Sequence, residues 1–160
     1  MGNRKKIRFA VVGAGHIGKR HAEMIRRDEG AVLVAICDIR PKEELGIEAY
    51  DVPFFRSLED LLQSGLIIDV VNICVPNGLH AQIAIRAMET GHHVVIEKPM
   101  ALTRQDAEKV VYASLYYQKR VFCVMQNRYS PPSVWIKKMV ESGRLGKIYM
   151  VQVNCYWNRD

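Results

Sequence analysis

The chain has 160 residues, 49% of them apolar and 25% charged, with a formal net charge of +6. This composition excludes the disordered and fibrous classes, and the length suits one domain with at most part of another. No apolar stretch is long enough to cross a membrane. The positive charges lie among acids and form no basic stripe. This argues against nucleic acid as a partner and favours a solvated surface with an anionic small-molecule ligand.

The cysteines and histidines show no metal-binding or disulfide pattern. The four cysteines contain no Cys-x-x-Cys pair, and each lies in an apolar, strand-like run: Cys37, Cys74, Cys123 and Cys155. We expect buried free thiols, which suit a reducing compartment. Because the segment after the basic N-terminus is too short for a signal-peptide core, we expect a cytoplasmic protein. No metal site is expected, and His16, His21, His92 and His93 are interpreted as solvated or packed side chains.

The first half of the chain alternates between strands and helices. The hydrophobic pattern predicts strands over residues 7–12, 31–37 and 52–54, and helices over residues 16–28 and 41–50. The run 31–37 is continuously apolar, which is typical of a parallel strand buried on both faces. Gly30 is expected to end the first helix in a left-handed C-cap conformation.

The same alternation continues to residue 125. Strands are predicted over residues 67–75, 93–96 and 121–125, and helices over residues 79–90 and 103–117. Ser57 and Thr103 are each followed three residues later by an acid, which indicates helix N-caps. Strands and helices that alternate over short loops predict an α/β fold: a Rossmann-type, doubly wound parallel sheet with helices on both faces.

The last part of the chain has a different pattern. Pro131 and Pro132 open a predicted helix that reaches residue 141. Residues 147–157 alternate between apolar and polar, as in a strand with one solvated face, yet a lone strand would lack a partner. We therefore expect residues 1–126 to form a dinucleotide-binding domain and residues 127–160 to be the truncated start of a second, α+β domain.

A glycine-rich loop, Gly13-x-Gly15-x-x-Gly18, follows the first predicted strand and opens the first helix. Gly13 permits the tight turn, Gly15 lets the backbone approach a pyrophosphate, and Gly18 allows close packing of helix on strand. The helix N-terminus, which carries His16 and Ile17, adds partial positive charge for the phosphates. A glycine turn without a ligand is the alternative, and the strand before, the helix after and a downstream acid argue against it.

That acid is Asp38, which ends the second strand 20 residues beyond Gly18. Its carboxylate can accept hydrogen bonds from both ribose hydroxyls of a dinucleotide. This favours NAD, because the 2′-phosphate of NADP would meet the negative charge. Arg40 could pair with such a phosphate, so NADP stays open as the less favoured cofactor.

The segment from Pro76 to His80 follows the strand 67–75 at the carboxyl edge, where open α/β sheets bind ligands. It has two interpretations. Either this loop borders the nicotinamide half of the cofactor, or Asn77 merely caps the next helix and His80 packs on its first turn.

Glu97-Lys98-Pro99 follows the next strand at the same edge. Lys98 is either an ordinary surface charge or the group that binds and deprotonates the reacting hydroxyl of a substrate. The second interpretation is favoured, because a dehydrogenase needs such a group beside the cationic nicotinamide ring.

Together these residues resemble the glucose–fructose oxidoreductase/inositol dehydrogenase (Gfo/Idh/MocA) family. The likeness rests on Gly18-Lys19-Arg20-His21, Asp38, Pro76-Asn77-x-x-His80 and Glu97-Lys98-Pro99. It implies an N-terminal NAD(P) domain and a C-terminal sheet that binds sugar-like substrates and mediates homo-oligomers. It also implies that Glu97 lies beside the cofactor, that Lys98 contacts the nicotinamide ribose and the substrate hydroxyl, and that the Lys98–Pro99 peptide is cis.

A narrower likeness lies in residues 126–132 and 154–159. Both segments resemble the UDP-N-acetylglucosamine-type sugar 3-dehydrogenases of lipopolysaccharide O-antigen biosynthesis, which oxidise the 3-hydroxyl of a UDP-linked N-acetylhexosamine or its uronic acid. The likeness implies that Gln126 lies near the nicotinamide and that Arg128, Trp157, Asn158 and Arg159 lie towards the substrate. Packing in a sheet of the second domain is the alternative for Trp157.

The leading hypothesis is therefore an NAD-dependent sugar-nucleotide oxidoreductase in which Lys98 orients and polarises the reacting hydroxyl. The family's second catalytic group, a histidine of the C-terminal domain, has no counterpart here. The 160 residues alone are thus expected to bind the dinucleotide but to turn over poorly or not at all. Two alternatives stay open: a dehydrogenase of the family for another sugar or inositol, and a non-catalytic dinucleotide-sensing module.

Overall fold

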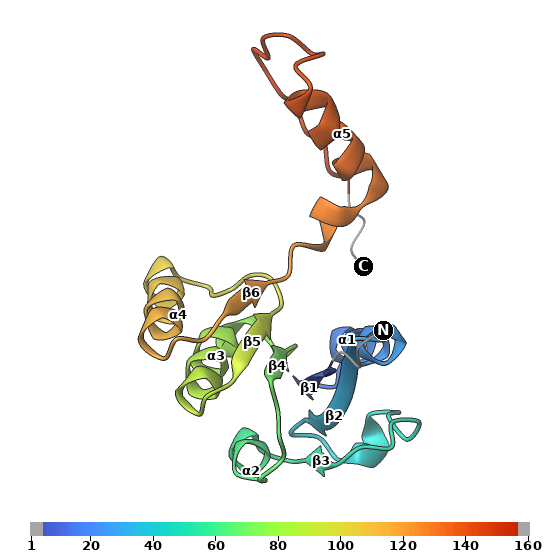
Figure 1. Ribbon diagram of the computed structural model, residues 1–160, viewed down its shortest axis with the longest axis vertical. Coiled ribbons are helices and arrows are strands. Elements are labelled where there is room, and N and C mark those ends of the chain that lie inside the picture. The colour runs from blue at the N-terminus through green and yellow to red at the C-terminus, as the bar shows by residue number, and fades with distance from the viewer. Residues whose placement is uncertain (1–4, 157–160) are drawn as a thin grey trace. The chain divides into compact units, whose positions relative to one another are not determined.

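The computed structural model describes residues 5–156, which form two compact units that meet between Val124 and Met125. The first unit is a six-stranded sheet in which every pairing is parallel, in the order β3-β2-β1-β4-β5-β6 (Figure 1). The strands are β1 (Ile7–Val12), β2 (Ala31–Cys37), β3 (Phe54–Phe55), β4 (Val70–Ile73), β5 (His93–Ile96) and β6 (Val121–Cys123). This strand order is that of the Rossmann fold, so the predicted fold class is confirmed.

Helices cover both faces of the sheet, as the alternating pattern predicts. In β1, Ala10 and Val12 belong to one buried cluster, with residues of the helices on one face. Val11 points the other way, into a second cluster with Ala22 and Ile25 of the first helix. In Figure 1, α1 lies on one side of the sheet and α3 and α4 lie on the other. The helices of this unit are α1 (His16–Arg27), α2 (Leu58–Leu62), α3 (His80–Glu89) and α4 (Arg104–Tyr116).

The helix starts follow the predicted caps, whereas the end of α1 does not follow the prediction. The hydroxyl oxygens of Ser57 and Thr103 each accept a hydrogen bond, at 3.1 Å, from the backbone N–H three residues on. Gly30 does not adopt the left-handed conformation expected of it. Instead, the C-cap residue Asp28 is extended, and its carboxylate accepts a hydrogen bond of 2.7 Å from the Gly30 N–H. A local side-chain turn therefore replaces the glycine cap.

The segment between β2 and β3 departs furthest from the prediction in the first unit. Only a single 3-10 turn, η1 (Lys42–Glu44), forms where a helix was expected over residues 41–50. Gly46 has a φ of +59°, which breaks the helix, and the side chains of Leu45 and Ile47 on either side are buried in the cluster beneath α1. Tertiary burial therefore decides the conformation of this segment.

Two predicted strands are shifted or shortened. β3 pairs only through Phe54 and Phe55, so it begins two residues later and ends one residue later than expected. β4 begins at Val70, because Ile67 is 66% exposed and Asp69 binds Arg8 of β1 before the ladder starts. In both cases only part of the apolar segment pairs with a neighbouring strand.

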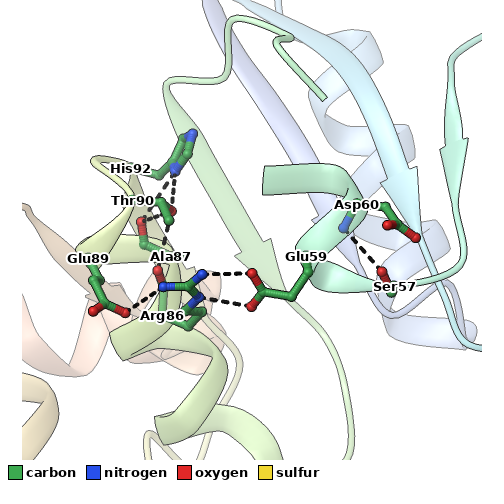
Figure 2. A network of polar contacts seen from close by, with 8 residues as sticks. All are labelled: Ser57, Glu59, Asp60, Arg86, Ala87, Glu89, Thr90 and His92. Atoms are coloured by element: carbon green, nitrogen blue, oxygen red, sulfur yellow. Dashed lines mark hydrogen bonds and ion pairs between the residues drawn. The ribbon is translucent and has the colours of Figure 1, made fainter. Parts of the chain in front are cut away.

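An ion-pair network links α2 to α3 on the surface of the first unit (Figure 2). The Arg86 guanidinium donates two hydrogen bonds to the Glu59 carboxylate, at 2.8 and 2.7 Å, and a third of 2.8 Å to Glu89. The hydrogen bonds from Arg86 hold the pKa of Glu59 below its ordinary value. One turn on, the Thr90 hydroxyl donates to the backbone carbonyl of Ala87, which closes the end of α3.

The second unit holds a 3-10 turn, η3 (Gln126–Tyr129), and one helix, α5 (Pro131–Glu141). Ser130 caps α5, with Pro131 in its first turn as predicted. The strand expected over residues 147–157 does not form in its described part, 147–156, where the side chains are exposed. An extended segment becomes a strand only when its backbone pairs with a neighbour, and the described residues offer this segment none. Within the described residues, no helix is long and apolar enough to cross a membrane.

Candidate functional site

A cavity of about 490 Å³ opens at the carboxyl edge of the sheet in the first unit. Its walls come from the ends of β1, β2 and β4, so it lies where the strand order reverses and open α/β sheets bind ligands. Its volume lies within the usual range for ligand pockets. The lining residues are Val12, Gly13, Gly15, His16, Ile17, Cys37, Asp38, Ile39, Arg40, Leu58, Cys74, Val75, Pro76, Leu79 and Ile83.

The glycine loop forms one wall, and its three glycines meet three different demands. Gly13 has a φ of +89°, and a Cβ there would come within 2.6 Å of the Cys74 carbonyl oxygen. A Cβ on Gly18 would come within 1.7 Å of the Gly13 carbonyl oxygen, so α1 packs directly on the loop. A Cβ on Gly15 would meet no protein atom within 4 Å, because this residue faces the cavity. The space above Gly15 is therefore open to a ligand.

The N-terminus of α1 is suited to an anion. Gly15 is the N-cap residue, no side chain caps the helix, and its first turn carries no acid. The free N–H groups and the helix dipole therefore present partial positive charge beside the lining residues His16 and Ile17. This wall offers a pyrophosphate free N–H groups and open space, and binding of a pyrophosphate here stays a prediction of the glycine pattern.

Asp38 follows β2 next to the glycine loop, is 9% exposed and is anchored by two backbone N–H groups. One carboxylate oxygen accepts a hydrogen bond of 2.7 Å from the Ala14 N–H, and the other accepts one of 2.9 Å from the Arg40 N–H. Burial alone would raise the pKa of Asp38, but these two hydrogen bonds and the Arg40 guanidinium lower it below its ordinary value. The carboxylate is thus ionised and oriented, with lone pairs left for two ribose hydroxyls.

Arg40 lines the same end of the cavity and is half exposed. Its guanidinium Nε lies 3.4 Å from an Asp38 oxygen, so part of its charge is already paired. An adenosine 2′-hydroxyl therefore meets a carboxylate held by its own cation. A 2′-phosphate would have to separate that pair, which supports NAD over NADP.

The loop after β4 contributes less than its sequence suggests. Pro76 lines the cavity, whereas Asn77 is exposed, makes no side-chain cap and is absent from the lining. His80 is buried, with its ring nitrogens 2.7 Å from the Pro99 carbonyl oxygen and 2.8 Å from that of Val75. Both nitrogens are therefore occupied by backbone carbonyls, and His80 ties the loop after β4 to the turn after β5.

Glu97 and Lys98 leave β5 at the same edge. Glu97 continues the sheet through a 3.1 Å hydrogen bond from its N–H to the Ile73 carbonyl. Lys98 is exposed, and the Lys98–Pro99 peptide is cis, as expected. Neither Glu97 nor Lys98 lines the 490 Å³ cavity. They follow β5, which pairs with β4, and the lining residues Cys74 and Val75 follow β4, so Lys98 leaves the sheet beside the β4 end of the cavity.

The remaining predicted site residues belong to the second unit or lie outside the described residues. Gln126 and Arg128 are in η3, and Arg128 shares an open hollow with Lys137 of α5. Trp157, Asn158 and Arg159 lie outside the described residues. Among the described residues, no group of three or more His, Cys, Asp or Glu side chains could hold a metal ion.

The cysteines are free, and two of them line the cavity. Burial, and secondarily the charges of Asp38 and Asp60, raises the pKa of Cys37 to about 12. Burial and the charge of Glu97 raise that of Cys74 to about 12. Both thiols are thus protonated, apolar parts of the wall. Cys155 is exposed, contrary to the expectation of a buried thiol, because the strand that would have buried it does not form.

The sequence interpretation missed two polar residues near the site. His21 and Asn72 form hydrogen bonds to each other, and His21 also binds Glu97. One signal was available: Asn72 is a polar residue inside an otherwise apolar parallel strand that is buried on both faces. His21 was noted in the sequence only within the family likeness and as a solvated or packed histidine, because its hydrogen-bond partners lie 51 and 76 residues away along the chain.

The family model of the Gfo/Idh/MocA oxidoreductases, described as an oxidoreductase family with an NAD-binding Rossmann fold, matches residues 7–124. The chain therefore belongs to this family and carries an NAD-binding Rossmann domain. Myo-inositol 2-dehydrogenase of Thermotoga maritima is 29% identical over 154 residues, a match that covers 92% of this chain and 44% of that protein.

Two solved structures are more similar in sequence. The WlbA dehydrogenase from Bordetella pertussis, in complex with NADH and UDP-GlcNAcA, is 40% identical with a TM-score of 0.92, and the match covers 98% of this chain and 48% of that one. The WlbA dehydrogenase from Chromobacterium violaceum, in complex with the same two ligands, is 36% identical with a TM-score of 0.91, covering 100% and 46%. The chain spans about half the length of these relatives.

Proposed function

We propose that this chain is the cofactor-binding half of an NAD-dependent dehydrogenase that oxidises the 3-hydroxyl of a UDP-linked N-acetyl sugar or its uronic acid. The observation that carries the proposal is the shared sheet edge. The glycine loop, the anchored carboxylate of Asp38 and the exposed amine of Lys98 all follow strands at that edge. The first two suit a dinucleotide, and the third suits a hydroxyl group that loses a proton.

Each group has one chemical role in this proposal. The free N–H groups at Gly15 bind the pyrophosphate, and Asp38 accepts hydrogen bonds from the adenosine ribose. Lys98 binds the substrate hydroxyl through Nζ and takes its proton. A nicotinamide bound here would supply the acceptor for the hydride that leaves the carbinol carbon. Pro76 and Glu97 flank the nicotinamide end. The family likeness assigns Gln126 to the cofactor and assigns Arg128, Trp157, Asn158 and Arg159 to the sugar nucleotide.

The substrate class rests on similarity. The chain is 40% and 36% identical to dehydrogenases solved with NADH and UDP-GlcNAcA, against 29% for an inositol dehydrogenase. A nucleotide-linked sugar acid also suits the net charge of +6. The product, a 3-keto sugar nucleotide, would serve the assembly of lipopolysaccharide O-antigen. A sugar-nucleotide substrate and the free thiols support a cytoplasmic protein, and the second domain would form a homo-oligomer.

The proposal is tested on the full-length protein. NADH formation is measured with NAD and each of UDP-GlcNAcA, UDP-GlcNAc and myo-inositol, for the wild type and for Lys98→Met. We expect turnover with UDP-GlcNAcA, and a loss of roughly 10²–10⁴-fold in Lys98→Met with NADH binding retained. Wild-type turnover in Lys98→Met would remove the assigned role of Lys98.

Other outcomes point to the two alternatives. The curated relatives include inositol dehydrogenases, so turnover of myo-inositol without turnover of the UDP-sugars would move the protein to that substrate class. NADH binding without turnover of any sugar would instead identify a dinucleotide-sensing module.

A further inference from the structure

Three polar side chains form a hydrogen-bonded chain beneath the carboxyl edge of the first unit. Asn72 of β4 lies with its amide nitrogen 3.1 Å from His21 Nδ1, and His21 Nε2 lies 2.9 Å from Glu97 Oε1. The other oxygen of Glu97 accepts a hydrogen bond of 3.1 Å from the backbone N–H of Lys98. This network of hydrogen bonds therefore runs from the sheet interior, through the glycine-loop helix α1, to the lysine that the proposed function places at the substrate.

The direction of these hydrogen bonds follows from the groups themselves. An amide NH₂ only donates, so His21 Nδ1 accepts and carries no proton. His21 Nε2 then carries a proton and donates a hydrogen bond to the Glu97 oxygen. Each contact of this network therefore pairs one donor with one acceptor.

Burying the polar side chain of Asn72 in β4 lowers the stability of the fold, which argues for a role beyond packing. It is 4% exposed, in a strand whose other residues are Val70, Val71 and Ile73. Its side-chain oxygen has no hydrogen-bond partner among the described residues. An unpaired buried polar atom destabilises a protein, and a Leu of similar size would avoid that cost. What Asn72 supplies and Leu lacks is the N–H donor to His21.

Glu97 needs the support that His21 gives. Its side chain is only 15% exposed, and its charge reaches both Cys74 and Cys123, where, after burial, it helps to raise the thiol pKa. A carboxylate this enclosed is held by the donors that surround it. Its side-chain oxygens accept from His21 and from the Lys98 N–H. Without His21, the carboxylate would turn towards water and release the Lys98 backbone.

We propose that His21 is a positioning residue that fixes Lys98 through Glu97, so that the helix binding the pyrophosphate also sets the place of the substrate-binding lysine. The inference rests on the role of Lys98 in the proposed function. It gives α1 a second role, because the same helix that presents N–H groups to the phosphates also supports the opposite end of the cofactor site.

The test compares His21→Leu with His21→Gln in the full-length protein. Leu removes both hydrogen bonds, whereas the Gln amide can still accept from Asn72 and donate to Glu97, so Gln is the matched control. The structural readout is hydrogen exchange, measured by mass spectrometry, in a peptide that spans Glu97 to Met100. Pro99 has no amide hydrogen, so few amides besides that of Lys98 contribute to the signal.

We expect exchange in this peptide to be about threefold faster or more in His21→Leu and close to wild type in His21→Gln. With UDP-GlcNAcA, kcat should fall roughly 10- to 100-fold in the Leu variant, because a small misplacement of a reacting group is costly. KM and the Kd for NADH should change by less than about threefold. Wild-type exchange and wild-type kcat in a folded His21→Leu would overturn the inference.

Two further variants keep the test decisive. If His21→Leu does not fold, His21→Asn replaces it, because the shorter amide can keep the contact with Asn72 but does not reach Glu97. The same rise in exchange is expected, and its absence overturns the inference. Lys98→Met separates this inference from the proposed function. Full activity in Lys98→Met refutes the role of Lys98, whereas inactivity there with a fully wild-type His21→Leu refutes only the positioning role.

Discussion

Gly15 and Gly18 lie three residues apart in one loop, yet an added methyl group should affect ligand binding at Gly15 and stability at Gly18. At Gly18 it would collide with the backbone of Gly13, at 1.7 Å from the carbonyl oxygen, where no flexible side chain can yield. At Gly15 it would meet open space within the protein. We therefore expect that Gly15 is required by the ligand and Gly18 by the fold.

We expect Gly18→Ala to destabilise the chain by about 3 kcal/mol or more, because α1 must move off the loop. Gly15→Ala should change the free energy of unfolding by less than about 1 kcal/mol and still weaken NADH binding at least roughly tenfold, because its methyl group occupies the phosphate space. Urea unfolding and NADH fluorescence titration measure the two quantities. Tight NADH binding by Gly15→Ala would place the phosphates elsewhere.

Asp38 is bound on both carboxylate oxygens by backbone N–H groups, of Ala14 and of Arg40. In Asp38→Asn, the amide NH₂ would face one of these donors, so one backbone N–H would lose its acceptor. The glycine loop is therefore anchored to the end of β2 by the same carboxylate that we propose selects the cofactor.

We expect Asp38→Ala to lower the ratio of Kd for NADP to Kd for NAD by roughly tenfold or more, because a charge repulsion of about 1–4 kcal/mol with the 2′-phosphate is removed. Arg40→Ala is the matched control and should move the ratio the other way, since it removes the nearby cation. Competition titrations with the two dinucleotides give both ratios. An unchanged ratio in Asp38→Ala would show that the adenosine ribose does not lie at this residue.

Between elements, a polar link of three hydrogen bonds joins β1 to the start of β4. Arg8 donates to the Asp69 carboxylate through its backbone N–H at 2.8 Å and its guanidinium at 2.9 and 2.6 Å. The hydrogen bond from the Arg8 guanidinium lowers the pKa of Asp69 to about 2. The two strands flank the point where the strand order reverses, so this pair fixes the sheet at the far end from the cavity.

The lowered pKa gives a definite pH dependence. Asp69 in the unfolded chain titrates near an ordinary value of about 3.9. The stability from the pair is therefore present above about pH 4 and lost as pH falls through about 2. We expect Asp69→Asn to cost about 1 kcal/mol at pH 6, a value kept small because both side chains are partly exposed. Urea midpoints from pH 6 to pH 2 should converge; a constant difference would contradict this.

Elements were predictable from the sequence where a local rule decides them. The hydroxyl oxygens of Ser57 and Thr103 each accept a hydrogen bond from the backbone N–H three residues on, so the sequence pattern and the structure agree. The segment around Gly46 and the described part of 147–157 failed because their conformations depend on partners distant in sequence. Burial of Leu45 and Ile47 prevents the helix predicted over residues 41–50. The lack of a neighbouring strand prevents the strand predicted over residues 147–157 in its described part.

The same division holds for the candidate site. The glycine loop and Asp38 were found from spacing, because the loop is continuous and the acid ends the adjacent strand. The apolar wall was not found, since Leu58 and Ile83 come from elements that only the folded sheet brings to the cavity. His80 was open between cofactor contact and packing, and its two carbonyl contacts favour the packed interpretation.

At the scale of the whole molecule, the first unit is self-sufficient and the second is not. Both buried clusters lie within the first unit, along with the cavity, Asp38 and Lys98. In the second unit the described residues include none that is buried, and Trp135, Ile136 and Val140 of α5 are about half exposed or more. Cofactor binding and substrate turnover should therefore separate when the 160 residues are studied apart from a full-length protein.

We expect the 160-residue chain to bind NADH saturably, with Gly15→Ala as the negative control, because every group assigned to the phosphates and the adenosine ribose lies in the first unit. With NAD and UDP-GlcNAcA it should form NADH at least roughly a hundredfold more slowly than the full-length protein, because substrate is not held against Lys98. Fluorescence titration and NADH absorbance measure the two activities. Turnover by the 160 residues at the full-length rate would place the complete catalytic set within them and would contradict the assignment of a second catalytic group to the rest of the protein.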